Sequence, residues 1–175
     1  RPNQVWVSDI TYIPMQNGKW VYLAAWMDRY SRKIVGWNLD VHMREELVLK
    51  ALQNAVDRYK PSHGLIVHSD RGGQYFGNRF RKLIDKCLFR QSMAGKKSAY
   101  ENAHAESLWA TIKREMLEKG SFDSLEDAQT ELFDYIEVYY NRIRRHSALG
   151  YESPEKFEQI YNQNELLILQ SKLSV

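Results

Sequence analysis

The chain has 175 residues, of which 43% are hydrophobic, so it can form one domain with a full-sized core and is not a disordered chain. Its net charge of +3 permits a nucleic-acid partner without requiring one. The longest apolar run, Trp20 to Met27, is too short to cross a bilayer, and the N-terminus lacks the apolar segment of a signal peptide. The single cysteine, Cys87, excludes an internal disulfide and fits a reducing cytoplasm.

The N-terminal part of the chain predicts an antiparallel meander. Val5 to Ile13 is rich in β-branched and aromatic residues, as strands are. The pair Asn17-Gly18 is a strong hairpin signal, and strands over 20–28 and 33–41 follow it. Consecutive strands with such short links pair antiparallel.

From residue 44 onward, helices alternate with short strands. Apolar residues at helical spacing predict a helix over 44–59, and 64–70 then forms a strand that can pair parallel because a helix precedes it. A helix over 78–88, a strand over 89–93 and long helices over 99–120 and 124–146 complete the order. We therefore expect an α/β fold with a mixed five-stranded sheet, three antiparallel strands and then parallel ones, flanked by helices. Residues 1–158 would form this domain, and 159–175 a tail, helical in one interpretation, that takes part in packing or assembly.

Two aspartates occupy unusual places on the predicted strands. Asp9 lies in mid-strand between two faces that are both largely apolar, where an ionised carboxylate is costly unless it is paired or bound to a cation. A salt bridge or a solvated strand end would also explain it. Asp70 ends the short apolar run "LIVHSD" at the mouth of a buried strand, where open α/β sheets bind ligands. Its alternative role is that of an ordinary turn residue before two glycines.

A third carboxylate lies on the predicted helix over 99–120. The apolar residues of that helix fall within one arc of the helical wheel: Ala105, Leu108, Ile112 and Met116. Glu106 lies opposite this arc, and Lys113 follows on the same stripe two turns later; an ordinary surface helix would carry both as well. Three carboxylates within a few ångströms repel by about 4 kcal/mol per pair at 4 Å, and divalent cations remove that cost. The combination indicates a metal-dependent nuclease or strand-transfer site.

Five segments carry a family resemblance that covers residues 2–158: "PNQVWVSDITYI", "DRYSRKIVGW", "HSDRGGQY", "ENAHAESLWATIKRE" and "YNRIRRHSALGYESPEKFE". Thirty-five residues separate Asp70 from Glu106, the spacing of the D,D-35-E signature. The chain resembles the catalytic, integrase-core domain of a bacterial insertion-sequence transposase of the OrfB type, in the DDE transposase and retroviral-integrase superfamily. The resemblance implies a ribonuclease-H-like fold.

The same resemblance implies an enzyme that cleaves phosphodiester bonds at transposon ends and transfers the 3′-hydroxyl end to target DNA by in-line attack. It assigns Asp9, Asp70 and Glu106 as the catalytic ligands of two Mg²⁺ or Mn²⁺ ions, and places Lys113 on the backbone of the transposon end. Arg71, Gln74 and Tyr75 border the second carboxylate and could position DNA, although Tyr75 could also simply pack. Asp28, a further carboxylate on a predicted strand, is left out of the site and expected in a hairpin or surface role, and the aromatic pair Tyr139-Tyr140 is expected in the core. Further DNA contacts are expected from locally basic segments: Lys96, Lys97, Arg114, Arg142, Arg144 and Arg145.

The expected partners are transposon-end and target DNA, with a homo-oligomer assembled on them, and neither a membrane nor an organic cofactor. The expected location is the bacterial cytoplasm, on the nucleoid when DNA is bound. The helix-turn-helix segments that such transposases carry upstream are not in this chain, which therefore resembles an excised catalytic domain or the second part of a larger protein. The run "GKKSAYENA" departs from the family in carrying Glu101 where an aspartate is usual, and Ser98 with Glu101 could form a capping box.

Other functions explain less of the sequence. A ribonuclease-H-like nuclease without strand transfer and a non-catalytic DNA-binding assembly module remain the alternatives, although such a module has no use for three converging acids. Scattered histidines and one cysteine argue against zinc, and the Gly-x-Ser-x-Gly elbow of serine hydrolases is missing. A paired-carboxylate glycosidase would leave Lys113 unexplained. His68 and His104 could orient water or phosphate, or could be ordinary packed histidines.

Overall fold

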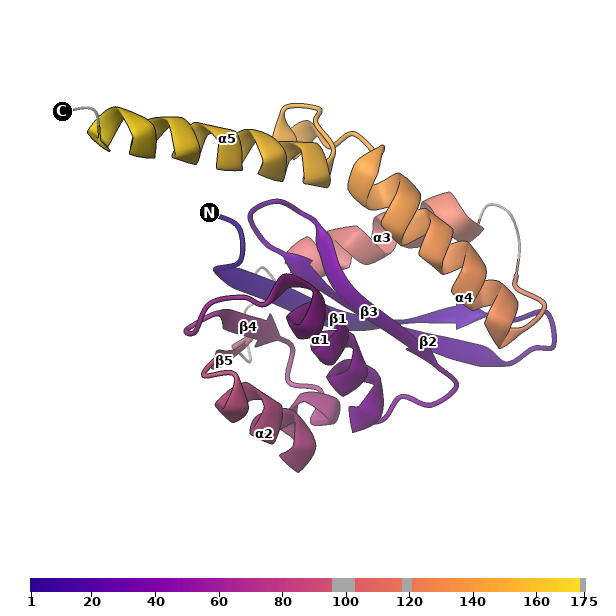
Figure 1. The fold of residues 1–175 in the computed structure, drawn as a ribbon. Coiled ribbons are helices and arrows are strands. Elements are labelled where there is room, and N and C mark those ends of the chain that lie inside the picture. The colour runs from indigo at the N-terminus through magenta and orange to yellow at the C-terminus, as the bar shows by residue number, and fades with distance from the viewer. Residues whose placement is uncertain (96–102, 118–120, 174–175) are drawn as a thin grey trace.

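The computed structural model describes residues 1–95, 103–117 and 121–173, and the side chains of 1–95, 108–116 and 121–173. One sheet of five strands, in the order β3-β2-β1-β4-β5, forms its centre (Figure 1). Its strands are β1 (Val5–Pro14), β2 (Trp20–Asp28), β3 (Ile34–Asp40), β4 (Ile66–Ser69) and β5 (Arg90–Met93). The first three pair antiparallel, β4 pairs parallel with β1, and β5 pairs parallel with β4. The predicted mixed sheet is confirmed.

Helices cover both faces of the sheet, α1 in front of it and α3 behind it in Figure 1. The helices are α1 (Glu45–Tyr59), α2 (Asn78–Lys86), α3 (Ala103–Leu117), α4 (Leu125–Phe133) and α5 (Pro154–Leu173), with a 3₁₀ turn η1 (Gly73–Phe76). Most of these bounds lie within a few residues of those predicted from periodicity. The Ser124 cap of α4 is present, since its hydroxyl accepts a hydrogen bond from the Asp127 amide at 3.0 Å.

Two apolar cores result from the alternation of side chains along β1. Val7 and Ile13 point toward α3 and α4, where they join Leu108, Ile112 and Leu132. Trp6, the neighbour of Val7 on the strand, points the other way, into a core with α1 and α2 whose members include Trp26, Leu52 and Phe80. A central strand buried on both faces carries large apolar residues on both, which explains the near-continuous hydrophobicity of this segment.

The helix predicted over 124–146 is not regular. After α4 the chain continues as a π-helical segment, η3 (Asp134–Tyr140). The buried residues repeat every four positions: Ala128, Leu132, Ile136 and Tyr140. In a regular α-helix each step of four residues turns the side chain by about 40°, so three steps would rotate the last one away from the core. The wider π turns keep all four on the sheet side. They leave Tyr139 exposed, although an aromatic pair with Tyr140 in the core was expected.

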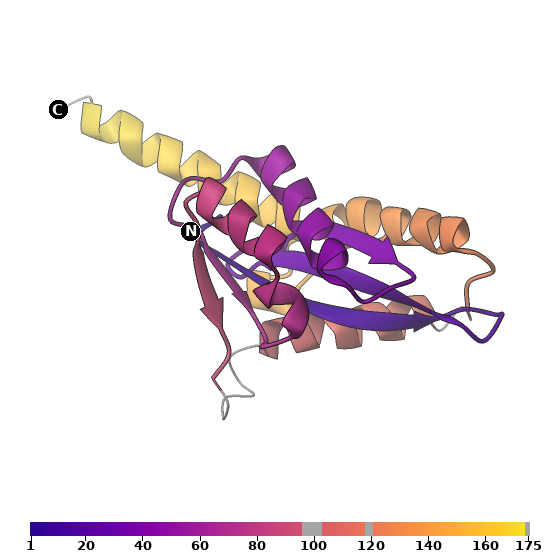
Figure 2. The same cartoon turned by 90° about the horizontal axis from the view of Figure 1, so that it is seen from below.

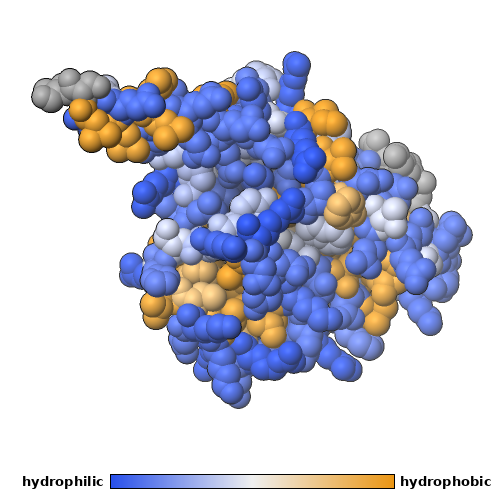
Figure 3. Space-filling model, in the orientation of Figure 1, coloured by the Kyte–Doolittle hydropathy of each residue, from blue (hydrophilic) through white to orange (hydrophobic). Residues whose placement is uncertain are grey.

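The C-terminal helix α5 runs without a break through residue 158, where the predicted tail begins. Its first turns pack on the body, since the Tyr30 ring lies 5.4 Å from that of Phe157 and 5.5 Å from that of Tyr161. Beyond Tyr161 every described residue is exposed, and hydrophobic side chains gather near its free end (Figure 3). The division of the chain at residue 158 stays a prediction. None of the described helices combines the length and the hydrophobicity that a membrane span requires.

Candidate active site

The two predicted aspartates lie near the parallel pair of β1 and β4, in which Val5 aligns with Ile66 and Val7 with His68. This pairing ends at Val7 and His68, and Asp70 directly follows β4. Continued two residues further, the same register would bring Asp9 opposite Asp70. Asp9 lies two residues after Val7 on β1 and so shares its face, the face covered by α3. We call this pair of aspartates the carboxylate edge, and their meeting stays a prediction.

The turn after β4 holds Asp70 at the surface. Its Oδ1 accepts a hydrogen bond from the amide of Gly72 at 2.9 Å. A Cβ on Gly72 would lie 2.8 Å from Oε1 of Gln74 and 3.0 Å from that same Asp70 oxygen, so a larger residue here would have to displace these side-chain oxygens. The side chain of Asp70 is exposed, and none of the ion pairs within the described part of the chain includes it. Oxygen lone pairs of Asp70 thus remain available to a cation.

A buried tyrosine lies beneath the carboxylate edge on the other face of β1. Its chain segment, η1, folds back after Asp70, so the hydroxyl of Tyr75 lies 3.0 Å from Oγ of Ser8. Burial raises the pKa of Tyr75, and the charges of Asp9 and Asp70 act in the same direction. The phenol therefore stays neutral. Because the charges of both carboxylates raise its pKa, Asp9 and Asp70 each lie within electrostatic range of this hydroxyl. Tyr75 has the packing role that the sequence left open.

A third strand aspartate shows how the fold treats a structural carboxylate. Asp28 at the end of β2 is completely buried. It accepts hydrogen bonds from the backbone amides of Asn3, Tyr30 and Ser31, which compensate for its removal from water. The hairpin role expected for Asp28 fits this geometry. Asp9, by contrast, is half-buried, and its Oδ1 accepts a hydrogen bond from the backbone amide of the next residue, Ile10, at 2.8 Å.

Helix α3 carries the third acid along the same face of the sheet. The apolar stripe predicted for it packs there, with Leu108, Ile112 and Met116 buried and Trp109 widening the stripe. Glu106 precedes Leu108, the first buried residue of this stripe, by two positions on α3. Its side chain is outside the described residues, as is that of His104. The described residues contain no group of three or more acidic, histidine or cysteine side chains placed so that they could hold a metal ion. The meeting of Glu106 with the carboxylate edge thus stays a prediction.

Lys113 has a defined place two turns after Glu106. Its ammonium nitrogen lies 4.3 Å from the ring centroid of Tyr12, a cation–π contact. Trp20 packs edge-on against that ring at 5.0 Å, and both aromatic side chains are about half exposed. Because β4 pairs with β1 only up to Val7, this group borders an open stretch of β1 beyond the carboxylate edge. Sequence reasoning missed it, although exposed aromatics beside a hairpin turn were a visible signal.

The remaining predicted DNA contacts fall into different surroundings. Arg71 donates from Nε to the carbonyl of Ala94 at 2.9 Å, and Gln74 donates to that of Met43 at 3.3 Å, so both brace the turn beside Asp70. Exposed Arg114 lies 3.6 Å from Glu115, and exposed Arg142 lies 3.4 Å from Glu155. Lys96 and Lys97 lie outside the described residues, as does the Ser98–Glu101 capping box.

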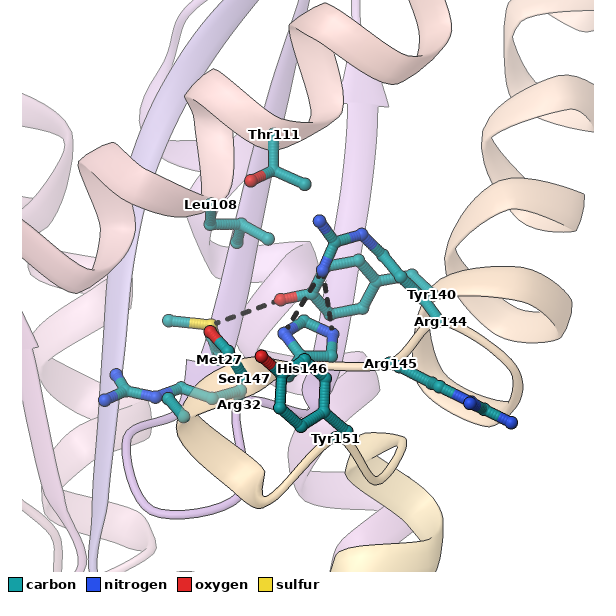
Figure 4. A pocket seen from close by; sticks show the side chains of 11 residues that line it. Met27, Arg32, Leu108, Thr111, Tyr140, Arg144, Arg145, His146, Ser147 and Tyr151 are labelled. Carbon is teal, nitrogen blue, oxygen red and sulfur yellow. Dashed lines mark hydrogen bonds between the residues drawn. The ribbon is translucent and has the colours of Figure 1, made fainter.

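Arg144 and Arg145 line a cavity of about 510 Å³ (Figure 4). The cavity lies on the side of α3 that bears Thr111, opposite to Lys113. Leu108 and Thr111 of α3 form one wall, and the β2–β3 turn contributes Arg32. The segment after η3 supplies the other wall, including His146 and Tyr151. We call this cavity the arginine pocket. Arg32 had not been singled out from the sequence, because only the tertiary structure brings its turn next to this segment.

The strand order is that of a ribonuclease-H-like fold, and comparison with solved structures shows the same fold. The HTLV-2 integrase catalytic core domain in complex with magnesium matches with a TM-score of 0.68 and 15% identity, over 89% of this chain and 96% of that one. The catalytic domain of Mos1 mariner transposase matches with a TM-score of 0.63 and 18% identity, over 78% of this chain and 71% of that one.

Sequence comparison places the chain in a family. The integrase core domain model matches residues 1–99, and a second model of the same description matches 88–154. The chain belongs to the integrase core domain family. It is 43% identical over 161 residues to the transposase for insertion sequence element IS904 of Lactococcus lactis, covering 92% of this chain and 63% of that protein. Transposase InsF for insertion sequence IS3fB of Escherichia coli is 42% identical over 163 residues, with 93% and 55% covered. The chain spans little more than half the length of several such relatives.

Proposed function

We propose that the chain is the catalytic domain of an insertion-sequence transposase, which cleaves DNA at transposon ends and joins the 3′-hydroxyl end to target DNA. The observation that carries the proposal is the parallel pairing of β1 and β4, whose register, continued two residues, would bring Asp9 opposite Asp70 on one face of the sheet. Two acids from distant parts of the chain repel each other in this arrangement, and the repulsion is removed when they share a cation. The family membership and the relatives named transposases support the same function.

The donor set fits a divalent metal of the magnesium type. Carboxylate oxygens are the ligands that Mg²⁺ and Mn²⁺ prefer, and Asp70 has lone pairs that the protein itself does not use. Asp9, Asp70 and Glu106 would hold two such ions. Bound ions of this kind neutralise charge on the scissile phosphate and activate an oxygen nucleophile. Solved neighbours of the same fold include cores determined with magnesium, which supports the choice of metal.

The chain's own residues would position the DNA. Lys113, held over the ring of Tyr12, presents a cation beside the carboxylate edge, where it would contact a backbone phosphate of the transposon end. Arg71 and Gln74 stiffen the turn that carries Asp70. A rigid turn keeps the carboxylate in place while the nucleophilic hydroxyl aligns with phosphorus, and such positioning supplies a large share of the barrier reduction in displacement reactions.

The proposal includes two features of the working assembly. The DNA partners would be transposon ends and target, held by a homo-oligomer in the bacterial cytoplasm on the nucleoid. A nuclease of this fold that cuts without joining is the second candidate, and it shares the carboxylate edge. Only the fate of the cleaved end separates the two.

The test offers the chain a labelled duplex that ends in the transposon terminus, together with a supercoiled plasmid and Mg²⁺. The proposal expects labelled plasmid, the product of joining. Labelled fragments without joining would establish the second candidate, and binding without either product would contradict both. The sequence of the terminus comes from the DNA that flanks the coding region.

A variant separates catalysis from binding in this assay. Glu106→Gln should abolish joining and cutting, since the amide cannot provide the second anionic oxygen, while the affinity for DNA in EDTA stays within about twofold. An equal loss of binding and catalysis would instead assign Glu106 a structural role. The matched control is Glu131→Gln, an exposed glutamate on α4 away from the sheet, which should retain full activity.

A further inference from the structure

The arginine pocket is a cationic cavity. Arg32, Arg144 and Arg145 line it, and the other lining residues are neutral or are His146, with neither aspartate nor glutamate among them. Hydroxyl groups of Thr111, Ser147 and tyrosines add hydrogen-bonding groups. Three cations from two segments far apart in the sequence repel one another, so their meeting raises the question of what neutralises them.

Only one of the three has a protein counter-ion in the described part of the chain. Glu115 of α3 binds Arg144, whose Nε and Nη2 lie 2.8 to 3.0 Å from its oxygens. The remaining nitrogen, Nη1, lies 3.3 Å from both ring nitrogens of His146 (Figure 4). Glu115 also accepts the hydroxyl hydrogen bond of Tyr135 at 2.7 Å, so its oxygens are fully used. Glu115 thus serves Arg144 and, at 3.6 Å, exposed Arg114, and it forms no ion pair with Arg32 or Arg145.

Arg32 and Arg145 have no such partner among the described residues. Figure 4 shows them on two sides of the opening, with Arg144 and His146 between them. Arg32 is half-buried, and its backbone has the left-handed φ of 62°, a conformation that costs a side-chain-bearing residue energy. The charge of nearby Asp28 acts on Arg32, but no ion pair of the described residues includes this guanidinium, so it is suited to an anion from solution.

The titration of the histidine agrees with a positive potential in the cavity. Burial, followed by the charges of Arg144 and Arg32, lowers the pKa of His146 to about 4, against an opposing effect of Glu115. Tyr140, the other titratable group in contact with the ring, lies 4.9 Å from it between centroids. The imidazole is thus neutral at pH 7 and can donate one hydrogen bond.

We propose that the arginine pocket binds a phosphate of the DNA backbone, with Arg32 and Arg145 contacting the strand on the two sides of the opening. The proposal rests on the transposase function above and adds a second DNA contact surface, on the opposite side of α3 from the carboxylate edge. The proposal adds Arg32, which the sequence had not indicated, to the expected DNA contacts. It treats Arg144 as a positioning residue, which Glu115 holds and which contacts His146.

An extended polyanion fits these observations better than a small free anion. The two unpaired guanidinium groups flank the opening and do not converge within it, so a single free phosphate would leave at least one of them without a contact. A DNA strand offers a phosphate at each nucleotide and can reach both sides. The position on α3 is also informative, because Thr111 and Glu115 lie on the face of this helix opposite to Lys113. One helix would then connect two contacts with DNA.

The test measures binding of a fluorescent duplex in EDTA over a range of salt concentrations. Arg32→Gln and Arg145→Gln should each make the slope of log K against log salt less negative by about 0.9, the value for one phosphate contact. Arg32→Lys should retain the wild-type slope, which separates loss of charge from damage to the turn. Arg29→Gln and Arg81→Gln remove the same charge from exposed sites outside the pocket and should leave the slope unchanged.

A second measurement identifies the source of the phosphate. The imidazole resonances of His146, followed by NMR, should show a raised pKa in the presence of duplex, and no rise in the Arg32→Gln, Arg145→Gln double variant. Equal slopes for pocket and control variants would overturn the proposal. So would a rise caused by inorganic phosphate but not by duplex, because that would mark a small-anion site. Either result leaves metal-dependent joining by the wild-type chain intact, so the proposed function is tested separately.

Discussion

The carboxylate edge and the arginine pocket lie on two sides of one helix and have opposite charge. At the edge, Asp9 lies on β1 and Asp70 follows its parallel neighbour β4, and the amides of Ile10 and Gly72 are bonded to their oxygens. At the pocket, Arg32 and Arg145 lack ion-pair partners within the described residues, while Arg144 is fully engaged by Glu115. Asp28 differs from both, because three backbone amides satisfy it inside the protein.

The difference indicates which charges serve the fold and which serve a ligand. A charge that stabilises the fold is enclosed and satisfied by the chain, as Asp28 and the Arg144–Glu115 pair are. Charges of one sign that gather at the surface destabilise the folded state until an ion of opposite sign arrives. By this criterion Asp70, with lone pairs that the described chain does not use, is suited to a divalent cation, and the pocket is suited to an anion.

The largest expected effect is at the carboxylate edge. Asp70→Asn removes an anionic ligand, and the charge stabilisation that a bound metal provides in the transition state amounts to several kcal/mol, which corresponds to a rate loss of about 10³-fold or more. DNA cleavage in Mg²⁺ measures this loss. Asp85→Asn on α2 is the exposed control and should be fully active.

Thermal unfolding with and without Mg²⁺ sharpens the same prediction. Saturating Mg²⁺ should raise the melting temperature of the wild-type chain but not that of Asp70→Asn, since a ligand stabilises only the state that binds it. If Mg²⁺ raised both melting temperatures equally, Asp70 would not be a metal ligand.

A smaller effect is expected from breaking the Arg144–Glu115 ion pair at the arginine pocket. Glu115→Gln leaves the guanidinium of Arg144 without its counter-charge, and loss of hydrogen bonds to a charged group of this kind costs about 2 kcal/mol. Urea unfolding should show this decrease in the free energy of unfolding. Glu131→Gln, on exposed α4 surface, should change it by less than about 0.5 kcal/mol. A Glu115→Gln chain as stable as the wild type would show that the pair serves no structural role.

The pH dependence of stability gives a prediction with a definite sign. His146 is neutral in the folded chain down to about pH 4, whereas in the unfolded chain it gains a proton below its ordinary pKa of 6.5. The unfolded state therefore binds more protons between these values, and stability falls as the pH decreases from 6.5 toward 4. His146→Gln should flatten this part of the profile of unfolding free energy against pH. An unchanged slope would contradict the lowered pKa.

The smallest expected effect concerns the cation beside the edge. Tyr12→Leu removes the ring that holds the ammonium of Lys113, and an exposed cation–π contact contributes about 0.5 to 1 kcal/mol. The affinity for transposon-end DNA should fall about threefold, while Tyr12→Phe, which keeps the ring, should bind as the wild type does. Equal affinities for all three proteins would show that Tyr12 does not position Lys113.

Much of the fold was predictable because the signals are local. The hairpin at Gly18, the capping by Ser124 and the apolar stripe of α3 each depend on residues within a few positions of one another. The π-helical segment was not predictable in the same way. A four-residue repeat of buried positions is compatible with an ordinary helix until the sheet fixes which side must remain buried.

By itself, the sequence determined the order of the elements and the type of sheet, since these follow from propensity and periodicity, and it predicted the acidic residues of the site. Only the tertiary structure decided that β4 pairs parallel with β1, the strand that carries Asp9, that Tyr75 lies under Ser8, and that Arg144 is paired while Arg32 and Arg145 form no ion pair with any described residue. These contacts join residues far apart in the chain. Their geometry is set by strand register and by the packing of helices on the sheet, which no local pattern encodes.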